Sequence, residues 1–577
     1  MKAGMALWAM MALGAALSLG SALDGAAAQP GQDLSRRWLF VMRSMRTQEE
    51  VERTIGLFPR AAAAGYNAIV LSDGALLSPA IEDPAYRANV LRVQEAARAH
   101  GLDLIPCVMH VGYGGSVLGY DPNLAEGFPV KDALFVAEGR EARLVADPPV
   151  GIRNGGFEEA EGHRFLGWDM QDSVGTGSFA DREVRHGGAQ SVRMENIAQA
   201  EPRWGHSRLM QVIKVRPFRQ YHLCAWVRTE DFEATESVRM LVLAPTEKER
   251  ALGDLAVRVK RTQDWTRYEL LFNSLSFEEV RVYIGAWGGR NGRLWWDDVE
   301  LEEIGALNVL RRDGCPITVK GEDGTIYEEG RDYEELRDPQ LRAYPTIHQP
   351  VPIRLTRGSR IREGARLRVS YYHALATPSD QVMFCLSEPK VYEILREQVR
   401  QVNELLHPRA FFMQHDEIRI ANWDYACQRR GLTPGQMLAD NVRQCVQMIR
   451  DLRPEAEIWV WSDMFDPMHN AVGDYYAVNG TWAGSWEGLD PKVGIVNWYG
   501  ELKGKNAPFF AARGHQQVLA GYYDWDEQGT GIRDWLAQTR GVAGIVGAMY
   551  TTWQDKYQAL ERWAEAAWGG AGEGSAR

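Results

Sequence analysis

Near-continuous apolar runs separated by helical stretches constrain the fold of this chain more than any other feature. The first three runs are "WLFVMR" from Trp38, "YNAIVLSD" from Tyr66 and "LDLIPCVMH" from Leu102. Helical patterns at about 47–64 and 89–100 separate them. Runs this apolar have no polar face, which is typical of parallel strands that are buried on both sides. The N-terminal part therefore predicts a series of βα units.

The same alternation returns in the last third of the chain. An amphipathic stretch from Glu388 to Leu406 leads into "AFFMQHDE", and four further runs follow: "EIWVWSDMF", "VGIVNWYG", "QVLAGYYDW" and "IVGAMYTTWQD". Together the two parts contain eight strand candidates, near residues 38, 67, 103, 410, 457, 493, 517 and 545. Eight βα units favour an α/β fold, a closed (β/α)8 TIM barrel. A doubly wound open sheet is the alternative architecture.

The middle of the chain has a different pattern. Residues 151–304 contain short alternating runs such as "HLCAWVRT" and "RVYIGAW", which are separated by turn residues and predict an antiparallel β-sandwich of the jelly-roll type. Residues 305–380 look like further β-rich elaboration. The predicted organisation is therefore a barrel interrupted after its third strand, with strands 1–3 in 38–148, the sandwich in 151–304, the elaboration in 305–380 and strands 4–8 in 381–568.

The N-terminus has the pattern of a secretory signal peptide. Lys2 precedes an apolar stretch from Met5 to Leu19, and small residues follow up to Ala28. We expect residues 1–28 to be removed and the protein to be secreted or periplasmic. An N-terminal membrane anchor is the alternative, although the apolar stretch is shorter than the ~20 residues that a membrane span needs.

Composition excludes some classes of partner. The 65 Lys and Arg against 77 Asp and Glu give a net charge of −12 without a basic run, so nucleic acid and anionic membranes are not expected partners. The 20 Trp and 21 Tyr fit either stacking on sugar rings or filling of cores. Six cysteines occur without a C-x-x-C pair, which argues against a zinc ribbon and leaves any disulfide pairing open.

Polar and aromatic residues follow every predicted barrel strand. In a barrel of this kind the carboxyl ends of the strands meet at one mouth, where the chemistry takes place. Any one of these residues could be a helix cap, a salt bridge or rim packing, but a ring of carboxylates and aromatics suits a site that cleaves sugars. A catalytic metal is not expected, because no H-E-x-x-H or comparable spacing occurs. The residues are Arg43, Asp73, His110, His415, Asp416, Glu417, Trp461, Asp463, Trp498, Tyr499, Tyr522 to Asp526, Trp553 and Asp555.

Several of these segments resemble glycoside hydrolase family 20, the β-N-acetylhexosaminidases, or a related family of the same clan. The segment "CLSEPKVYEILREQVRQVNELLHPRAFFMQHDEI" is similar to the family's helix and fourth strand, which ends in H-x-G-G-D-E. "IPCVMHVGYGGSVLGYDPNLAEG" resembles the loop after the third strand, and "EIWVWSDMF" resembles the fifth strand. "YTTWQDKY" is similar to the closing W-x-E region.

The resemblance implies a division of labour between two adjacent acids. In that family the substrate's own 2-acetamido oxygen attacks the anomeric carbon, so the enzyme needs no nucleophile, an exception among retaining glycosidases. By position, Asp416 would hold the acetamido N–H and Glu417 would be the general acid/base. The expected product is a terminal β-linked N-acetylhexosamine, either GlcNAc or GalNAc. The residues expected to bind substrate are Arg43, His110, His415, Trp461, Asp463, Trp498, Tyr499, Trp553 and Asp555.

Two departures from the family pattern concern the recognition of the sugar. Gln414 and His415 replace the two glycines before the acid pair, so a bulkier side chain is expected in the site. The W-x-E sequence has become W-x-D at Asp555, which is one methylene shorter. Because both changes touch groups that would contact the sugar, the preference between the two C4 epimers stays open.

The inserted segment resembles jelly-roll carbohydrate-binding modules, through "NGGFE", "HGGAQSVRM" and "WWDDVEL". Such modules often carry a structural calcium, for which the sequence indicates no ligands, and no other cofactor is expected. Trp204, Trp226, Trp287 and Trp295 are candidate platforms for sugars, although each could equally belong to the core. An insert that only shapes the barrel mouth is a further alternative.

Two other functions remain open at this point. One is a glycosidase of another mechanistic class, in which a carboxylate such as Asp463 faces Glu417 and acts as the nucleophile. The other is a glycan-binding protein without catalysis. In each case the partner is a glycan or oligosaccharide, and the oligomeric state is undetermined.

Overall fold

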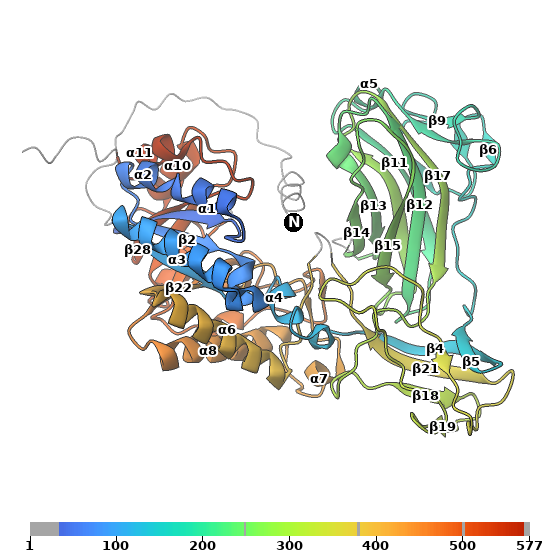
Figure 1. Ribbon diagram of the computed structural model, residues 1–577. Coiled ribbons are helices and arrows are strands. Elements are labelled where there is room, and N and C mark those ends of the chain that lie inside the picture. Colours follow the sequence, from blue (N-terminus) through green and yellow to red (C-terminus); the bar gives the residue numbers. More distant parts are fainter. Residues whose placement is uncertain (1–33, 247–249, 378–380, 499–501, 503, 570–577) are drawn as a thin grey trace, which may run out of the picture.

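The computed structural model describes residues 34–246, 250–377, 381–498, 502 and 504–569. The predicted signal peptide and Tyr499 lie outside the described residues. Figure 1 shows the barrel on one side, the sandwich on the other, and a smaller sheet below the sandwich.

Eight parallel strands form a closed barrel in the order of the chain. The barrel closes because β28 pairs with β1, for example Trp38 with Met549. Across the insertion β22 pairs directly with β3, Phe412 opposite Cys107. This confirms the predicted eight strands and excludes the open sheet. The strands are β1 Arg36–Met42, β2 Ala68–Ser72, β3 Asp103–Val108, β22 Ala410–Met413, β24 Glu457–Trp461, β26 Gly494–Asn497, β27 Gln517–Tyr522 and β28 Ile545–Thr551.

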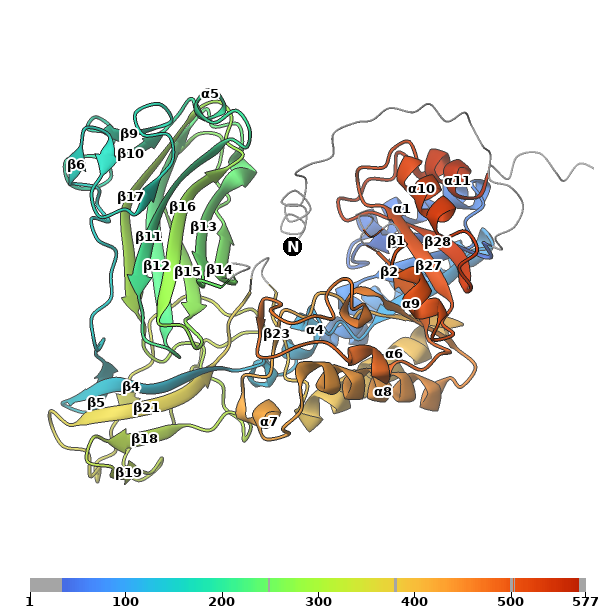
Figure 2. The same ribbon diagram turned by 180° about the vertical axis from the view of Figure 1, so that it is seen from behind.

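Helices cover the outside of the barrel (Figures 1 and 2). In the long helix α6 the buried side chains, such as Val391, Leu395 and Val399, recur every three to four residues on the face that meets the barrel. Helix α8 begins with a capping box between Thr433 and Gln436. The helices are α1 Gln48–Ile55, α2 Phe58–Ala63, α3 Pro84–Ala99, α6 Pro389–Leu406, α8 Pro434–Leu452, α9 Ala507–Ala511, α10 Thr530–Gln538 and α11 Leu560–Trp568.

The barrel interior is filled by large aromatic side chains. Trp38 and Trp459 pack edge to face with ring centroids 4.8 Å apart, and Phe412 packs against Trp461 at 4.9 Å. These rings and the branched residues around them form a core of their own inside the barrel. The barrel is therefore a packed scaffold, and truncation of one of these rings to alanine would cost about 3–5 kcal/mol of stability.

Two five-stranded antiparallel sheets make up the inserted segment. The strand orders are β15-β12-β17-β10-β9 and β14-β13-β16-β11-β8. Both views show the sheet with β13 and β14 on the side toward the barrel (Figures 1 and 2). The strands are β8 Met170–Gln171, β9 Ser178–Asp181, β10 Ser191–Met194, β11 His206–Lys214, β12 Gln220–Glu230, β13 Val238–Leu243, β14 Ala251–Ala256, β15 Gln263–Asn273, β16 Glu279–Trp287 and β17 Arg293–Glu303.

A third, six-stranded sheet differs from the predicted boundaries. Residues 128–144, which the prediction 38–148 placed with the barrel, form strands that pair with the 305–380 region, Phe135 opposite Leu367. The chain leaves and re-enters the barrel at this point, so the two flanks of the insertion satisfy each other's backbone hydrogen bonds. The sheet has its own core. Its strands are β4 Phe128–Glu138, β5 Glu141–Leu144, β18 Thr318–Gly321, β19 Ile326–Tyr327, β20 Ile353–Arg354 and β21 Arg366–His373.

Short elements complete the fold. Two of them, β23 (Ile420–Ala421) and β25 (Ala477–Val478), pair in parallel and join the loop after Glu417 to the loop after Asp463. The others are α4 Gly115–Leu118, β6 Ala160–Glu161, β7 Arg164–Phe165, α5 Ile197–Ala200 and α7 Tyr425–Gln428. Within the described ranges, no helix has the length and apolar character that a membrane crossing requires.

Candidate active site

Three carboxylates meet where β22 and β24 end. Asp416 and Glu417 follow β22, and Asp463 follows β24. The Glu417 backbone N–H donates to Asp463 Oδ2 at 2.9 Å, and Asn470 Nδ2 donates to the same oxygen at 2.9 Å. Asp463 is fully buried. It is therefore fixed beneath Glu417, and its position holds the backbone of the acid pair.

Glu417 combines an unusual backbone conformation with two strong partners. Its φ is 50°, in the left-handed region that residues with a side chain rarely adopt, and such strain is concentrated at functional sites. Its Oε2 accepts from the Tyr113 hydroxyl at 2.5 Å, and its Oε1 pairs with the Arg419 guanidinium at 2.9 Å. The Glu417 side chain keeps 21% exposure, so its carboxyl group can reach a bound molecule.

Asp416 is buried next to two other acids. Burial raises the pKa of its carboxyl group well above the usual range, and the charges of Asp463 and Glu417 act in the same direction. Its Oδ1 is buried without a hydrogen-bond partner among the residues that the structure describes. An unpartnered buried oxygen costs about 1–3 kcal/mol, so a ligand N–H that reached it would be bound favourably.

The same environment acts on Asp463. Its burial raises the pKa of the carboxyl group to about 6. Asp416 and Asp463 therefore resist being ionised together, because like charges in a buried site repel each other.

The loop after β3 is packed directly onto the acid pair. Gly112 lies so close that a Cβ at this position would be 1.7 Å from the Asp416 carbonyl oxygen. The Val111 N–H donates to the Gln414 carbonyl at 2.8 Å. The loop is thereby held in register with β22. This backbone contact places the Tyr113 hydroxyl within hydrogen-bonding distance of Glu417.

Four aromatic rings form a connected group at this end of the barrel. Trp461 and Trp553 have ring centroids 6.2 Å apart, Trp553 and Tyr523 6.0 Å, and Tyr523 stacks on Trp498 at 5.9 Å. Trp461 is only 1% exposed and closes the barrel core, whereas Trp498 and Trp553 are half-buried. Burial raises the pKa of the Tyr523 phenol, and the negative charges of the three acids raise it further. The aromatic group therefore adjoins the carboxylates.

Arg43 and Asp555 are brought together by the ends of β1 and β28. Arg43 pairs with Asp555 and also lies 3.2 Å from Glu50, while its Nη1 donates to Thr54 at 3.1 Å. Asp555 pairs with Arg53 as well. The two predicted sugar-binding residues are thus neighbours, but the protein itself engages most of their hydrogen-bonding groups.

His415 is placed differently from the prediction. Its ring is fully buried and faces α8, with Nε2 3.1 Å from Asn441 Oδ1, and burial lowers its pKa to about 3. Successive residues of an extended chain point to opposite sides. Gln414 faces the barrel, where its Nε2 donates to Ser72 at 3.2 Å, so His415 points outward and Asp416 inward. Of the two residues that replace the glycines, Gln414 and not His415 faces the barrel interior.

Two other residues at strand ends have clear environments. Burial lowers the pKa of His110 to about 4, so its ring is neutral at physiological pH, and its Nε2 has no partner in the described part of the chain. Asp73 accepts from the Met45 N–H at 2.8 Å and from the Tyr86 hydroxyl at 2.7 Å. His110 remains a candidate contact for the ligand, whereas Asp73 caps local structure.

Several residues of the site were missed by reading strand ends alone. Tyr113, Arg419, Asn470 and Tyr476 come from loops, and their contacts depend on how those loops return to the mouth. Tyr523 lies within the predicted group from Tyr522 to Asp526, but the tyrosine that the sequence predicts to bind substrate is Tyr499, which lies outside the described residues. Tyr522, Tyr523 and Asp524 all have positive φ, and this turn is what directs the Tyr523 ring inward.

The four candidate tryptophans of the insert differ in their burial and in their contacts. Trp295 is fully buried and donates to Asp181 at 2.9 Å, so it belongs to the core and is not a platform. Trp226 stacks on His186 with centroids 3.9 Å apart, on the sheet that lies away from the barrel. Trp287 is half-buried at the end of β16, and Trp204 is 44% exposed.

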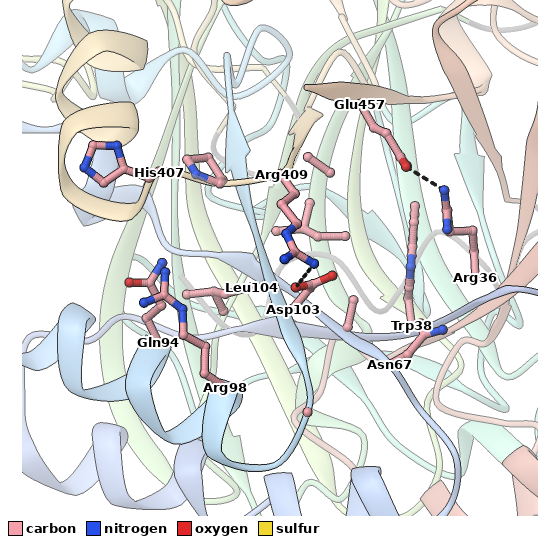
Figure 3. A pocket seen from close by; sticks show the side chains of 15 residues that line it. Arg36, Trp38, Asn67, Gln94, Arg98, Asp103, Leu104, His407, Arg409 and Glu457 are labelled. Atoms are coloured by element: carbon pink, nitrogen blue, oxygen red, sulfur yellow. Dashed lines mark hydrogen bonds and ion pairs between the residues drawn. The ribbon is translucent and has the colours of Figure 1, made fainter. Parts of the chain in front are cut away.

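A cavity of about 610 Å³ lies at the opposite, amino-terminal end of the barrel (Figure 3). Four of its charged residues form two pairs: Arg36 lies 2.5 Å from Glu457, and Arg409 lies 3.7 Å from Asp103. In barrels of this type catalysis takes place at the carboxyl ends of the strands. The carboxylates beyond β22 and β24 are therefore the better candidate, despite the size of this cavity.

Glu126, Cys385, Asp424 and Cys427 form a buried group whose donor atoms lie within 4.8 Å of one another, so that it could hold a metal ion. Its oxygens already accept hydrogen bonds, from the Trp423 N–H at 2.7 Å and from Arg312 at 2.8 Å. Burial raises the pKa of Glu126 to about 8. The group lies outside the insert, so the calcium expected there remains a prediction without ligands. The six cysteine thiols are free.

Comparison with known proteins gives distant structural similarity only. No protein-family model matches the sequence, and no curated protein matches it. A chitobiase of Flavobacterium johnsoniae is similar over 93% of this chain at 10% identity, with a TM-score of 0.36, and this chain covers 48% of it. A rhamnosidase of Novosphingobium sp. PP1Y is similar over 91% of this chain, at 11% identity and a TM-score of 0.32, with 55% of the rhamnosidase covered.

The insert also has similar structures. A carbohydrate-binding module described as CBM4 matches 26% of this chain and 99% of the module, at 14% identity and a TM-score of 0.20. Because all these TM-scores are below 0.5, we draw no functional conclusion from them.

Proposed function

We propose that this protein is a glycoside hydrolase that releases terminal β-linked N-acetylhexosamine by substrate-assisted, retaining catalysis. The observation that carries the proposal is the pairing of Asp416 with Glu417 at the mouth of the barrel. One acid is buried with an unpartnered oxygen, and the other is strained, partly exposed and hydrogen-bonded. Two adjacent acids in such different environments fit two different roles.

In the first step the carbonyl oxygen of the substrate's 2-acetamido group attacks C1. The bond from C1 to the leaving oxygen breaks, and Glu417 donates its proton to that oxygen. The Oδ1 of Asp416 accepts the acetamido N–H and stabilises the positive charge that develops on the oxazolinium ring. Because that charge appears only as the reaction proceeds, the interaction is stronger in the transition state than in the ground state.

In the second step water attacks C1 and the oxazolinium opens to regenerate the acetamido group. Glu417, now a carboxylate, accepts the proton from that water. The Tyr113 hydroxyl and the Arg419 guanidinium hold the two Glu417 oxygens while its charge changes. Asp463 keeps the Glu417 backbone in place through the N–H that it accepts.

The environment of Asp463 does not favour the alternative mechanism, in which this residue would be the nucleophile. A nucleophile must reach C1 of the sugar, whereas the Asp463 side chain is fully buried and its Oδ2 accepts two hydrogen bonds. Replacement of the enzyme nucleophile by the substrate's own amide fits this arrangement better.

The sugar itself would lie on the aromatic group. Trp498, Tyr523 and Trp553 offer ring faces for the apolar side of a pyranose. The charges of all three acids act on the Tyr523 phenol, so its hydroxyl is placed to contact the same ligand. Arg43 and Asp555 remain the proposed contacts for the sugar hydroxyls, and Gln414 would face the sugar from the end of β22. We further propose that the protein acts outside the cytoplasm, as its N-terminal sequence predicts.

The test is a panel of p-nitrophenyl β-glycosides assayed with the full-length protein. We expect release from the GlcNAc or GalNAc glycoside and not from the glucoside or galactoside, together with inhibition by an N-acetylhexosamine thiazoline. Rapid cleavage of a glycoside without the acetamido group would contradict the mechanism. Binding without turnover that is identical in Glu417→Gln would indicate a non-catalytic glycan-binding protein.

A further inference from the structure

The sandwich reaches the acid/base side of the active site. Arg250, at the start of the segment that leads into β14, donates to Asp474 of the barrel at 2.9 Å. Asp254 of β14 interacts electrostatically with Arg419, and Tyr476 interacts with both Asp254 and Arg239 of β13. These contacts are made by the sheet that lies toward the barrel in both views (Figures 1 and 2).

The same residues lead back to the catalytic acid. Arg419 pairs with Glu417 at 2.9 Å, and its guanidinium lies 4.7 Å from the centroid of the Tyr476 ring. The strand pair β23 and β25 fixes Tyr476 against Arg419, since Ile420 and Ala477 are partners in register. A continuous polar path therefore runs from Glu417 to the sandwich.

A buried ion pair stands at the end of this path. Arg239 and Asp254 are 2.6 Å apart, and their side chains are only 5% and 3% exposed. Burial raises the pKa of Asp254, and within the described residues its Oδ1 has no hydrogen-bond partner. A buried pair with an unsatisfied oxygen adds little to stability, because desolvation offsets the attraction. Such an oxygen is suited to receive a ligand hydroxyl.

Aromatic rings continue this face of the sheet. Leu241 lies opposite Asp254 on one side and Tyr283 on the other, so Tyr283 stands in the same row as the unsatisfied oxygen. Trp287 follows on the same strand face, with its ring 6.3 Å from that of Tyr283, and the Arg208 guanidinium lies 5.7 Å from the Trp287 ring. Both rings are half-buried and thus partly accessible.

A glycine interrupts the row between the two arginines. Gly285 pairs with Arg239 on one neighbouring strand and with Arg208 on the other. A Cβ at Gly285 would lie 2.3 Å from the Ser207 carbonyl oxygen, so no side chain can occupy this place. A strand glycine often marks a position where a ligand or another backbone approaches closely.

We propose that this face binds the part of an oligosaccharide that lies beyond the scissile bond. The residues are Arg208, Arg239, Asp254, Tyr283 and Trp287. The inference rests on the proposed function: Glu417 protonates the leaving oxygen, so the units of the leaving group extend on the Glu417 side, where Arg419, Tyr476 and then Arg239 follow. Partly exposed rings beside charged hydrogen-bonding groups suit sugars, whose C–H faces stack while their hydroxyls bond. The substrate class is therefore an extended β-linked oligosaccharide with its terminal N-acetylhexosamine in the barrel.

The experiment compares two substrates of the full-length protein that carry the same terminal sugar, namely the one accepted in the aryl-glycoside panel. One is its p-nitrophenyl glycoside and the other is a β-linked tetrasaccharide. In Trp287→Ala and in Tyr283→Ala, we expect the ratio of kcat/KM for the tetrasaccharide to kcat/KM for the aryl glycoside to fall about three- to tenfold, because each variant removes one ring face on which a sugar unit would stack. Trp226→Ala removes an equally large ring from the other sheet and should leave the ratio at the wild-type value.

The outcomes separate this inference from the function on which it rests. If the panel shows N-acetylhexosamine release but the ratio is unchanged in both variants, or falls as much in Trp226→Ala, the oligosaccharide-binding face is wrong and the proposed function stands. A uniform loss on both substrates leaves the ratio unchanged and counts against the face as well. If no acetamido glycoside is cleaved, the proposed function fails and this inference fails with it.

Discussion

The two ends of the barrel are built from the same strands but treat charge in opposite ways. At the amino-terminal end, around the cavity in Figure 3, acids and bases form exposed pairs such as Arg36 with Glu457. At the carboxyl-terminal end two buried acids, Asp416 and Asp463, lie beside the partly exposed Glu417, and burial raises the pKa of Asp416 well above its usual range. The comparison shows that a cluster of buried like charges identifies the candidate site better than the volume of a cavity does. The reason is that burying like charges next to each other lowers the stability of the fold.

The largest effect on the rate that this comparison predicts comes from replacing Glu417, the acid at the carboxyl-terminal end of the barrel. Glu417→Gln should lower kcat on the p-nitrophenyl N-acetylhexosaminide by about 10²–10⁴, which is the usual contribution of a general acid/base. The matched control is Glu457→Gln at the amino-terminal end, which should keep the wild-type kcat within about twofold. Steady-state kinetics of both variants would decide, and equal losses would mean that the two ends do not differ in function.

A backbone change at the mouth should have the next largest effect. A methyl group in Gly112→Ala meets the Asp416 carbonyl oxygen at 1.7 Å, so the loop carrying Tyr113 must move. We expect kcat to fall about 10²-fold, since small misplacements of catalytic groups have effects of this size. Gly74→Ala, where nothing lies within 4 Å of the new methyl group, is the control at the same end. Kinetics together with thermal melting would separate displacement of the loop from unfolding, and full activity of Gly112→Ala would contradict the packing.

The raised pKa values predict a pH effect with a definite sign. The mechanism requires an ionised Asp416, and the neighbouring Asp463 helps to raise the Asp416 pKa. Asp463→Asn removes that negative charge, favours the ionised form of Asp416 and lowers its pKa. The acidic limb of the kcat/KM profile should therefore move to lower pH by about one unit. Asp103→Asn at the amino-terminal end should leave the limb in place, whereas a limb that moves to higher pH in Asp463→Asn would contradict the assignment.

The smallest expected effect concerns the exposed pairs at the amino-terminal end. Arg36 and Glu457 have side chains that are 33% and 46% exposed, so their interaction is screened by solvent. A double-mutant cycle with Arg36→Ala and Glu457→Ala, followed by urea denaturation, should give a coupling free energy of about 0.2–1 kcal/mol. A coupling several times larger would mean that this end also contains strongly interacting charges, and the contrast between the two ends would be lost.

The sequence predicted the barrel because each strand is a near-continuous apolar run, which is the pattern of a strand that is buried on both sides. It also placed Asp416 and Glu417 at one mouth, since the position of a residue after a strand decides the end at which it lies. It did not predict that β4 and β5 leave the barrel, because a strand pattern does not name its partner. The outward direction of His415 could have been found from the period of two along an extended chain.

Contacts between loops could not be predicted from the sequence, for a different reason. The hydrogen bond from Tyr113 to Glu417 joins residues 304 positions apart, and it depends on a close backbone approach at Gly112. The approach of Arg239 and Asp254 to Tyr476 depends on how the sandwich packs against the barrel. Local patterns contain neither kind of information, and the positive φ of Glu417 likewise arises from its surroundings.

The most direct test of the central claim is the response of the rate to the nucleophilicity of the substrate's own amide. A series of p-nitrophenyl N-acetylhexosaminides would carry acetyl, fluoroacetyl, difluoroacetyl and trifluoroacetyl groups on the 2-amino nitrogen. Each fluorine withdraws electrons from the carbonyl oxygen, so substrate assistance predicts that kcat/KM falls steeply with every fluorine added. A rate that stays constant across the series would contradict the account, because it would mean that a group of the protein, and not the substrate's amide, attacks C1.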